Sequence, residues 1–476
     1  MNRRRFVAGT AAAITSCARR DSRPNVVAIL TDDQRWDCMS CAGHPFLKTP
    51  HMDRLASEGI RFANAFATTS LCSPSRASLL SGLYAHSHGV KNNFTEYPEA
   101  LESYPRRLRE EGYQTAYFGK WHMGENNDNP RPGFDKWMSH RGQGLYNDTE
   151  FNIDGRREKI PGYYTHVVTE AAAKWIGERK APFCAIVGHK APHSANVPEP
   201  KYAHLFDTAP IKPPATVDDT GEGKGDWVRK RLRTWHGIGG PLYGNNDYGK
   251  FVRTYLATIP SIDDSVGEIY RTLQRSGELD NTLFLFLADN GCLLGEHGAV
   301  DKRVMWEESI RVPLLARYPE RIKQPAVREQ MALNIDLAPT ILDFCGARPL
   351  TKTHGRSWRG IAEGHERAWR ESWCYEYDFE SEFPYTPNVR GVRTDEWKYI
   401  HYPNGEGHPD TELAELYHLR VDPGETRNLI GDPSQQARVI ELRAELARLI
   451  RAADGEPGRM PVNPIIRSEM PAERIR

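Results

Sequence analysis

The chain has 476 residues and a formal net charge of zero, with 63 basic and 63 acidic side chains. This balance provides no basic surface for nucleic acid or for an anionic membrane, so neither is expected as a partner. Hydrophobic residues make up 39% of the chain, which is enough for a globular core, and no apolar run is long enough to span a bilayer. The length predicts one large domain with a smaller one.

The first 22 residues have the features of an export signal. An arginine triplet at 3–5 precedes an apolar run over 6–14, an arrangement similar to a twin-arginine signal. The segment 14–17 resembles a bacterial lipoprotein cleavage box, with Cys17 as a candidate lipid anchor. A disordered basic tail is the alternative. The protein is therefore expected in the periplasm or outside a bacterial cell, with or without a lipid anchor.

The next part of the chain alternates between strand and helix patterns. Buried strands are expected in four apolar runs, each followed at once by polar residues: 25–30, 115–118, 183–187 and 282–288. Helices are expected over 50–58, 105–111, 166–179, 248–275 (with a break near Pro260) and 335–344. This alternation predicts a mostly parallel sheet covered by helices on both faces. Ligands of such sheets bind beyond the carboxyl ends of the strands, where the polar residues lie.

The pattern changes after a glycine-rich stretch over 355–364. Short strands are expected at 371–377, 389–394, 398–402 and 415–419. An amphipathic helix follows from Ser434. The expected organisation is an export signal (1–22), a large α/β domain (23–365) and a smaller C-terminal α+β subdomain with an antiparallel sheet and a helix (366–476).

The segment 72–82 reads as a helix that begins beside a cysteine. Ser73 can cap the helix, Pro74 suits its first position and Gly82 can end it. Cys72 would then lie at a helix N-terminus, where free N–H groups favour an anion. Arg76, one turn further on, can form paired hydrogen bonds with oxyanions. The alternative is an ordinary capped helix with a surface cysteine.

Two acidic pairs follow two of the expected strands. Asp32 and Asp33 come after the first strand, and Asp289 with Asn290 comes after the last. If the pairs converge, they repel each other unless a hard cation lies between them. Oxygen ligands with one amide suit Ca²⁺ or Mg²⁺ and argue against zinc. Either pair alone could be a turn or a helix cap.

The segment 72–82 resembles the signature of the type I (formylglycine-dependent) sulfatases, which belong to the alkaline phosphatase-like superfamily. The matching positions are Cys72, Pro74, Ser75, Arg76, Leu80 and Gly82. The likeness extends over essentially the whole mature chain, and 416–429 is similar to the C-terminal region of many sulfatases. It implies a mixed sheet sandwiched by helices. It also implies a nucleophile made from Cys72 by a formylglycine-generating enzyme.

The resemblance also implies the site residues. The implied metal ligands are Asp32, Asp33, Cys72, Asp289 and Asn290, with Ca²⁺ favoured over Mg²⁺. The implied catalytic residues are Cys72, Arg76, Lys120, His122, His193 and Lys302.

The resemblance also implies their roles, which are consistent with the charges that develop during sulfate transfer. Lys120 and Lys302, with the metal, would neutralise the sulfate oxygens. His193 is the candidate general acid for the leaving alcohol, with Lys302 as an alternative, and His122 would remove a proton from the group that expels sulfate. Arg76 would orient the nucleophile.

Three functions are consistent with these residues. The leading one is an exported enzyme that hydrolyses sulfate esters, with O-sulfate on a carbohydrate as the expected substrate. The second is a phosphate or phosphonate monoester hydrolase of the same superfamily, since some phosphonate hydrolases carry formylglycine. The third is a non-catalytic protein that binds sulfated glycans.

Recognition of the leaving group must come from residues around the sulfate. Candidates are the segment 196–248 (with Trp227, Trp235, His236 and Tyr243), Trp306, His401 and Tyr402, and His297 as a loop anchor or a substrate contact. The segment could instead pack as an ordered insertion.

Overall fold

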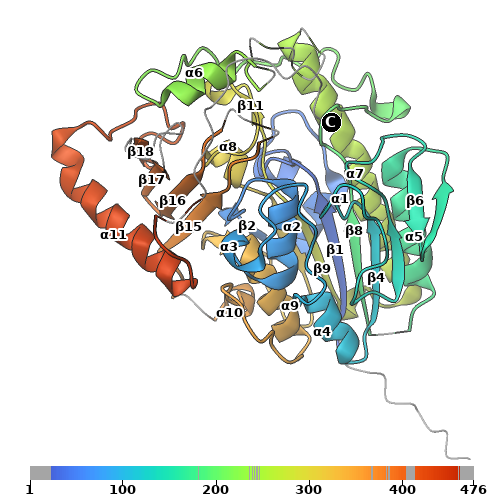
Figure 1. Cartoon of the computed structure of the whole chain (residues 1–476). Helices are drawn as coiled ribbons and strands as arrows, with labels where there is room; N and C mark the ends of the chain where they lie inside the picture. Colours follow the sequence, from blue (N-terminus) through green and yellow to red (C-terminus); the bar gives the residue numbers. More distant parts are fainter. Residues whose placement is uncertain are drawn as a thin grey trace, which may run out of the picture.

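A ten-stranded mixed sheet forms the centre of the computed structural model (Figure 1). The model describes residues 23–460, apart from 181, 235, 239, 241, 243, 244, 246, 366, 367, 382, 384, 385, 404–412 and 459. The sheet order is β13 (Ala326–Arg328), β2 (Ile60–Phe62), β12 (Leu314–Arg317), β9 (Thr282–Ala288), β1 (Asn25–Thr31), β8 (Phe183–Gly188), β4 (Gln114–Gly119), β5 (Lys136–Ser139), β6 (Glu150–Ile153) and β7 (Arg156–Lys159). Strands β9, β1, β8, β4 and β5 run parallel, so their carboxyl ends meet at one edge.

Helices cover both faces of this sheet, and the side chains of β1 show why. Val27 and Ile29 point into one core and Val26 and Ala28 into the other, because successive strand residues face opposite sides. The first core holds α1 (Pro50–Glu58), α5 (Tyr164–Gly177) and α7 (Tyr248–Ser276), and the second holds α2 (Cys72–Ser81), α4 (Tyr104–Glu110) and α9 (Leu337–Phe344). The predicted α/β architecture is confirmed.

The expected break near Pro260 is wrong, because α7 continues through that residue. The residues around it, including Ile259 and Ile262, are fully buried against the core that α7 shares with α1 and α5. Packing of this apolar face outweighs the one backbone hydrogen bond that proline cannot donate.

The C-terminal part forms a four-stranded antiparallel sheet with a helix on it, as predicted. Its elements are β15 (Ser372–Tyr377), β16 (Val389–Thr394), β17 (Trp397–Tyr402), β18 (Leu413–His418) and α11 (Gln436–Ala452). Leu442 and Leu446 of α11 are buried in a third core that also includes Phe66 and Leu71. The N–H of Glu376 in β15 donates to the carbonyl of Thr68 at 3.0 Å. The small sheet therefore lies directly against the segment that leads into α2.

Short elements connect these layers. They are β3 (Ala65–Phe66), β10 (Leu293–Leu294), β11 (Val300–Asp301), β14 (Ala332–Leu333), α3 (Ala85–His88), α6 (Asp226–Leu232), α8 (Glu307–Ile310) and α10 (Arg359–Ala362). No helix in the described part of the chain has both the length and the apolar character needed to cross a membrane. The export signal and Cys17 lie outside the described residues.

Candidate active site

Polar residues from four neighbouring strands meet at the carboxyl edge of the sheet. Asp32 and Asp33 follow β1, Asp289 follows β9, Lys120 follows β4, and the loop after β8 carries His193. Since β1 lies between β9 and β8, and β4 is the next strand beyond β8, these residues share one small region. The structure thus brings together groups that are up to 257 residues apart in the chain.

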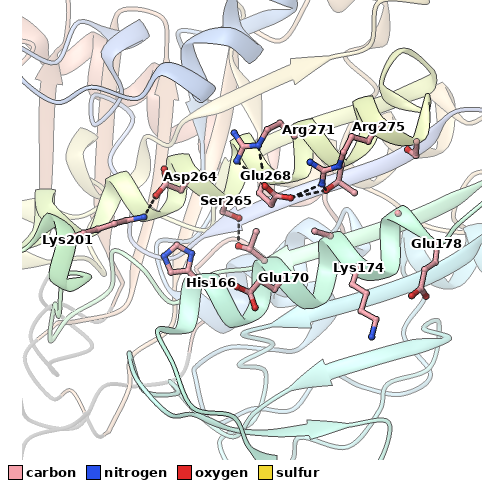
Figure 2. Close-up of a pocket in the computed structure, with 15 residues that line it drawn as sticks. His166, Glu170, Lys174, Glu178, Lys201, Asp264, Ser265, Glu268, Arg271 and Arg275 are labelled. Atoms are coloured by element: carbon pink, nitrogen blue, oxygen red, sulfur yellow. Dashed lines mark hydrogen bonds and ion pairs between the residues drawn. The ribbon is translucent and has the colours of Figure 1, made fainter.

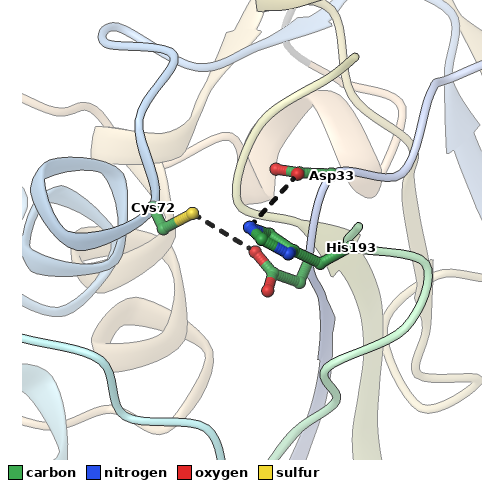
Figure 3. Close-up of side chains that lie close together, drawn as sticks. Asp33, Cys72 and His193 are labelled. Carbon is green, nitrogen blue, oxygen red and sulfur yellow. Dashed lines mark hydrogen bonds and ion pairs between the residues drawn. The ribbon is translucent and has the colours of Figure 1, made fainter. Parts of the chain in front are cut away.

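Cys72 is the first residue of α2 and is fully buried. Its sulfur lies 3.4 Å from Asp32 Oδ1. The Nε2 atom of His193 lies 3.7 Å from Asp33 Oδ2. Figure 3 shows the Cys72 side chain directed from the start of α2 toward His193 and Asp33. The cysteine therefore faces the group of acidic and basic side chains rather than solvent.

The prediction that Ser73 caps α2 is wrong. The N-cap is Leu71, which has no side-chain capping bond, and the Ser73 hydroxyl donates instead to the carbonyl of His122. Gly82 ends the helix in the left-handed region at φ 71°, as predicted. Ser73 thus ties α2 to the loop after β4.

Each of the three buried carboxylates has a cationic partner. The ion pairs are Lys120 with Asp32, Lys302 with Asp33 and Arg76 with Asp289. Lys302 Nζ lies 2.5 and 2.6 Å from the two Asp33 oxygens, and Arg76 Nε lies 2.9 Å from Asp289 Oδ2. Arg76 also donates to the carbonyl of Lys120 at 2.6 Å. These contacts fix the positions of cations that the chain buries at high desolvation cost.

Burial and neighbouring charges shift the pKa values of these groups in different directions. Burial alone would raise the pKa of Asp32, but Lys120, His193 and Arg76 hold that pKa well below its usual range. Burial and the charge of Asp32 raise the pKa of Asp289 to about 7. Burial also raises the pKa of the Cys72 thiol, so an unmodified Cys72 is a neutral thiol at pH 7.

The residues present fit a hard divalent cation. Ligand atoms of Asp32, Asp33, Cys72 and His193 all lie within 4.8 Å of one another. The side-chain oxygen of Asn290 is buried and has no hydrogen-bond partner within the described residues, while its nitrogen donates to Asp33 Oδ1 at 2.7 Å. An unsatisfied amide oxygen beside two carboxylates is a ligand set that Ca²⁺ or Mg²⁺ would complete.

The loop that carries Lys302 is held in an unusual backbone conformation. Asp301 and Arg303, which flank Lys302, have φ of 83° and 78°, values that cost energy in residues other than glycine. Buried contacts hold this conformation. Arg231 donates to the carbonyl of Lys302 at 2.7 Å, and Arg303 pairs with Glu380 at 2.7 Å. The Lys302 loop is thus fastened by the 196–248 segment and by the C-terminal subdomain.

Two residues that contact the site were not predicted. Glu125 Oε1 lies 2.9 Å from His122 Nε2, and Gln143 accepts a hydrogen bond from Lys120 Nζ. The Nδ1 atom of His122 is buried without a partner within the described residues. Glu125 lies only three positions after His122, so its spacing was visible. The turn that brings the two side chains together, in which His122 has a φ of 49°, could not be predicted from the sequence.

Several of the residues expected to contact the leaving group are buried instead, among them Tyr402 and His236, each 2% exposed. Trp227 and Trp306 are 0% and 1% exposed, and their rings stack at 6.3 Å. His297 is fully buried and its ring lies 4.3 Å from that of Trp306, which makes it a loop anchor. His401 is half-buried, and Trp235 lies outside the described residues. Aromatic content alone did not distinguish an ordered insertion from a pocket wall.

A large open groove lies elsewhere, between α5 and α7 (Figure 2). It has a volume of about 920 Å³, and none of the predicted catalytic residues lines it. Some of its charged side chains pair with each other: Lys201 with Asp264, and Arg271 and Arg275 with Glu268. These pairs are partly exposed, unlike the buried charges at the strand ends, so the groove is not the candidate active site.

Comparisons with known proteins show the family of this chain. The family model for sulfatases matches residues 24–347, and the model for the C-terminal region of N-sulphoglucosamine sulphohydrolase matches residues 295–452. An N-acetylglucosamine-6-O-sulfatase from Bacteroides thetaiotaomicron is 33% identical over an alignment of 509 residues, which covers 92% of this chain and 88% of that protein.

Solved structures have the same fold. A protein solved in complex with its substrate D-glucosamine-2-N,6-O-disulfate matches with a TM-score of 0.84 at 30% identity, over 92% of this chain and 99% of that one. A phosphonate monoester hydrolase of Agrobacterium radiobacter matches with a TM-score of 0.76 at 25% identity, over 90% and 96% of the two chains. The chain therefore belongs to the sulfatase family of the alkaline phosphatase-like superfamily and is a sulfate ester hydrolase.

Proposed function

We propose that this protein removes O-sulfate from a sulfated amino sugar, with the 6-O-sulfate of an N-acetylglucosamine or N-sulfoglucosamine unit as the preferred group. The observation that carries the proposal is the match to an N-acetylglucosamine-6-O-sulfatase over most of both chains. The structural match to a protein bound to a 6-O-sulfated glucosamine supports it. The cations gathered at the strand ends also support it, because they could hold the oxygens of a sulfate ester.

The proposed nucleophile is formylglycine at position 72, made from Cys72 by a formylglycine-generating enzyme. The raised pKa of the Cys72 thiol supports this, because a neutral buried thiol is a poor nucleophile. The hydrated aldehyde supplies a hydroxyl for attack on sulfur. A divalent cation, proposed to be Ca²⁺ held by Asp32, Asp33, residue 72, Asp289 and Asn290, supplies positive charge that favours the ionised form of that hydroxyl.

The chain's own residues do the remaining work. Lys120 and Lys302 place ammonium groups beside the acidic cluster, where they can hold sulfate oxygens as negative charge moves onto them. Arg76, fixed by Asp289 and by the Lys120 carbonyl, holds the start of α2 in register with the metal ligands.

Two histidines are proposed to move protons. Burial lowers the pKa of both His122 and His193, so both are neutral in the free enzyme near pH 7. A neutral His122 can accept a proton, and its Glu125 contact fixes the ring. His193 faces Asp33 and is the candidate donor to the leaving alcohol once it has gained a proton, with Lys302 as the alternative donor.

The second candidate is a phosphonate monoester hydrolase, favoured by the match to the Agrobacterium radiobacter enzyme. Hydrolysis of N-acetylglucosamine-6-sulfate, 4-nitrophenyl sulfate and phenyl phosphonate esters by the matured protein separates the candidates. The proposal predicts the highest kcat/KM on the sulfated sugar, with release of free sulfate. A higher kcat/KM on the phosphonate ester would overturn it.

We also propose export of the folded enzyme through its N-terminal segment (1–22), with Cys17 as a candidate lipid attachment site. The twin-arginine pattern supports this, because that export route carries folded proteins. An enzyme whose Cys72 is converted to formylglycine in the cytoplasm needs such a route. Fractionation of cells producing the full chain and a Cys17→Ala variant is the test. The proposal predicts activity in the periplasm or membrane, and activity confined to the cytoplasm would contradict it.

A further inference from the structure

Lys190 is a buried cation at the active site that neither the sequence analysis nor the proposed mechanism uses. It lies two residues beyond the end of β8 and is 5% exposed. The neighbouring Ala191 carbonyl accepts a hydrogen bond from the backbone N–H of Asp32 at 3.3 Å. The N–H of Lys120 donates to the carbonyl of Gly188 at 2.9 Å. The segment that carries Lys190 is therefore flanked by a candidate metal ligand and a candidate catalytic lysine.

The Lys190 ammonium has no carboxylate partner within the described residues. Among the described residues, the ammonium contacts the ring of Tyr146, whose centroid lies 5.2 Å from Nζ. The Tyr146 hydroxyl donates to the carbonyl of His193 at 2.7 Å, which holds that ring in the active-site loop. A cation–π contact offsets only part of the cost of burying an ammonium group. Burial and the charge of Lys120 lower the pKa of Lys190 to about 8.

Lys190 differs from the other cations of the site in its lack of a carboxylate partner within the described residues. Lys120, Lys302 and Arg76 each pair with one of the three carboxylates. Lys190 is the surplus cation, and buried charges in proteins are normally paired. Its electrostatic surroundings include Asp32, Asp33, Cys72 and Lys120, all of which belong to the reacting end of the site.

We propose that Lys190 is a substrate-binding residue whose ammonium group contacts an oxygen of the sulfate ester being cleaved. The inference rests on the proposed sulfatase function and adds a third lysine to the two that the family signature identified. Its low exposure and the contacts of its backbone segment with Lys120 and Asp32 favour the scissile sulfate over a second anionic group further along the sugar chain.

The test compares Lys190→Met, Lys190→Arg and wild type, all matured and loaded with Ca²⁺. Methionine keeps much of the side-chain volume without the charge, and arginine restores a charge. The Met variant is expected to lower kcat/KM for 4-nitrophenyl sulfate about 10- to 100-fold, the loss of one charge-assisted hydrogen bond. It should raise the Kd of inorganic sulfate, measured by calorimetry, by a similar factor. The Arg variant should recover most of both losses.

Lys201→Met is the matched control, because Lys201 pairs with Asp264 in the α5–α7 groove, which none of the predicted catalytic residues lines. It should change neither kcat/KM nor sulfate binding. A Lys190→Met variant with wild-type kcat/KM and wild-type sulfate affinity overturns the inference. So does an Arg variant as impaired as the Met variant, since that pattern marks a packing role. A wild-type enzyme that cleaves no sulfate ester contradicts the proposed function instead, and calorimetry with inorganic sulfate still tests Lys190 in that case.

Discussion

The protein has two clusters of charged side chains that differ in burial. At the strand ends, Asp32, Asp289 and Arg76 are at most 1% exposed. In the α5–α7 groove, Glu268 and Arg275 have side chains that are 35% and 63% exposed. Water screens the groove pairs, whereas the buried charges act on each other at low dielectric and shift each other's pKa values. Chemical function is therefore expected from the first cluster, although the second lines a large open groove.

Removal of the nucleophile should have the largest effect. Cys72→Ala is expected to abolish turnover of 4-nitrophenyl sulfate, since no neighbouring group can replace the reactive carbon. The melting temperature should stay close to wild type, because alanine fits the helix start. Activity within tenfold of wild type in the alanine variant would remove residue 72 from the mechanism.

Changes at the metal site should have the next largest effect, and calcium binding there should depend on pH. Asp289 has its pKa raised to about 7 in the metal-free protein, so a cation must displace a proton there below that pH. Calcium affinity should therefore rise with pH up to about 7 and then level off. Calorimetric titration at several pH values measures this.

Asp289→Asn is the matched variant for the metal site. It should bind Ca²⁺ more weakly, lose the pH dependence and lose the calcium-dependent rise in melting temperature. Equal melting temperatures of the wild type with and without chelator, at unchanged activity, would count against the site.

The contact between Glu125 and His122 should have an intermediate effect. Glu125→Gln keeps a hydrogen-bond acceptor but removes the charge that orients the imidazole. A loss of about 1.4 kcal/mol, or tenfold in kcat, is expected for a weakened charge-assisted bond, with KM little changed. Steady-state kinetics measure the split, and an effect confined to KM would place Glu125 in substrate binding instead.

Substitutions in the α5–α7 groove should have the smallest effect on stability and activity. Glu268→Gln removes the negative charge that pairs with Arg271 and Arg275, yet the change in the free energy of unfolding should stay below about 1 kcal/mol because these pairs are solvent-screened. Activity on sulfated sugars should be unchanged. A loss of activity on a long sulfated glycan, but not on 4-nitrophenyl sulfate, would show that the groove binds substrate and would break the contrast between the two clusters.

The sequence predicted the parts of the site that depend on strand ends and a short motif. Asp32 and Asp289 could be placed together because parallel strands finish at one edge, and Cys72 could be placed at a helix start by its neighbours. Glu125 and Lys190 were missed because their roles depend on loop conformation, which leaves no periodic signal. Trp306 was misassigned because aromatic residues occur both in hydrophobic cores and in the walls of binding pockets.

Other errors have the same origin. Pro260 forbids one hydrogen bond locally, but the buried face of α7 decides the outcome. Ser73 is a good capping residue by itself, yet its hydroxyl is used by the loop after β4. At both positions, tertiary contacts stabilise a conformation that differs from the one favoured by local sequence propensity.

The central claim is that residue 72 becomes formylglycine and that the enzyme works through it. Mass spectrometry of the peptide containing residue 72, from protein produced with and without a formylglycine-generating enzyme, tests this most directly when each sample is also assayed with 4-nitrophenyl sulfate. The account predicts a loss of about 18 Da relative to cysteine, the thiol being replaced by an aldehyde. Activity should rise in proportion to the converted fraction. Full activity in protein that carries only unmodified cysteine would contradict the account.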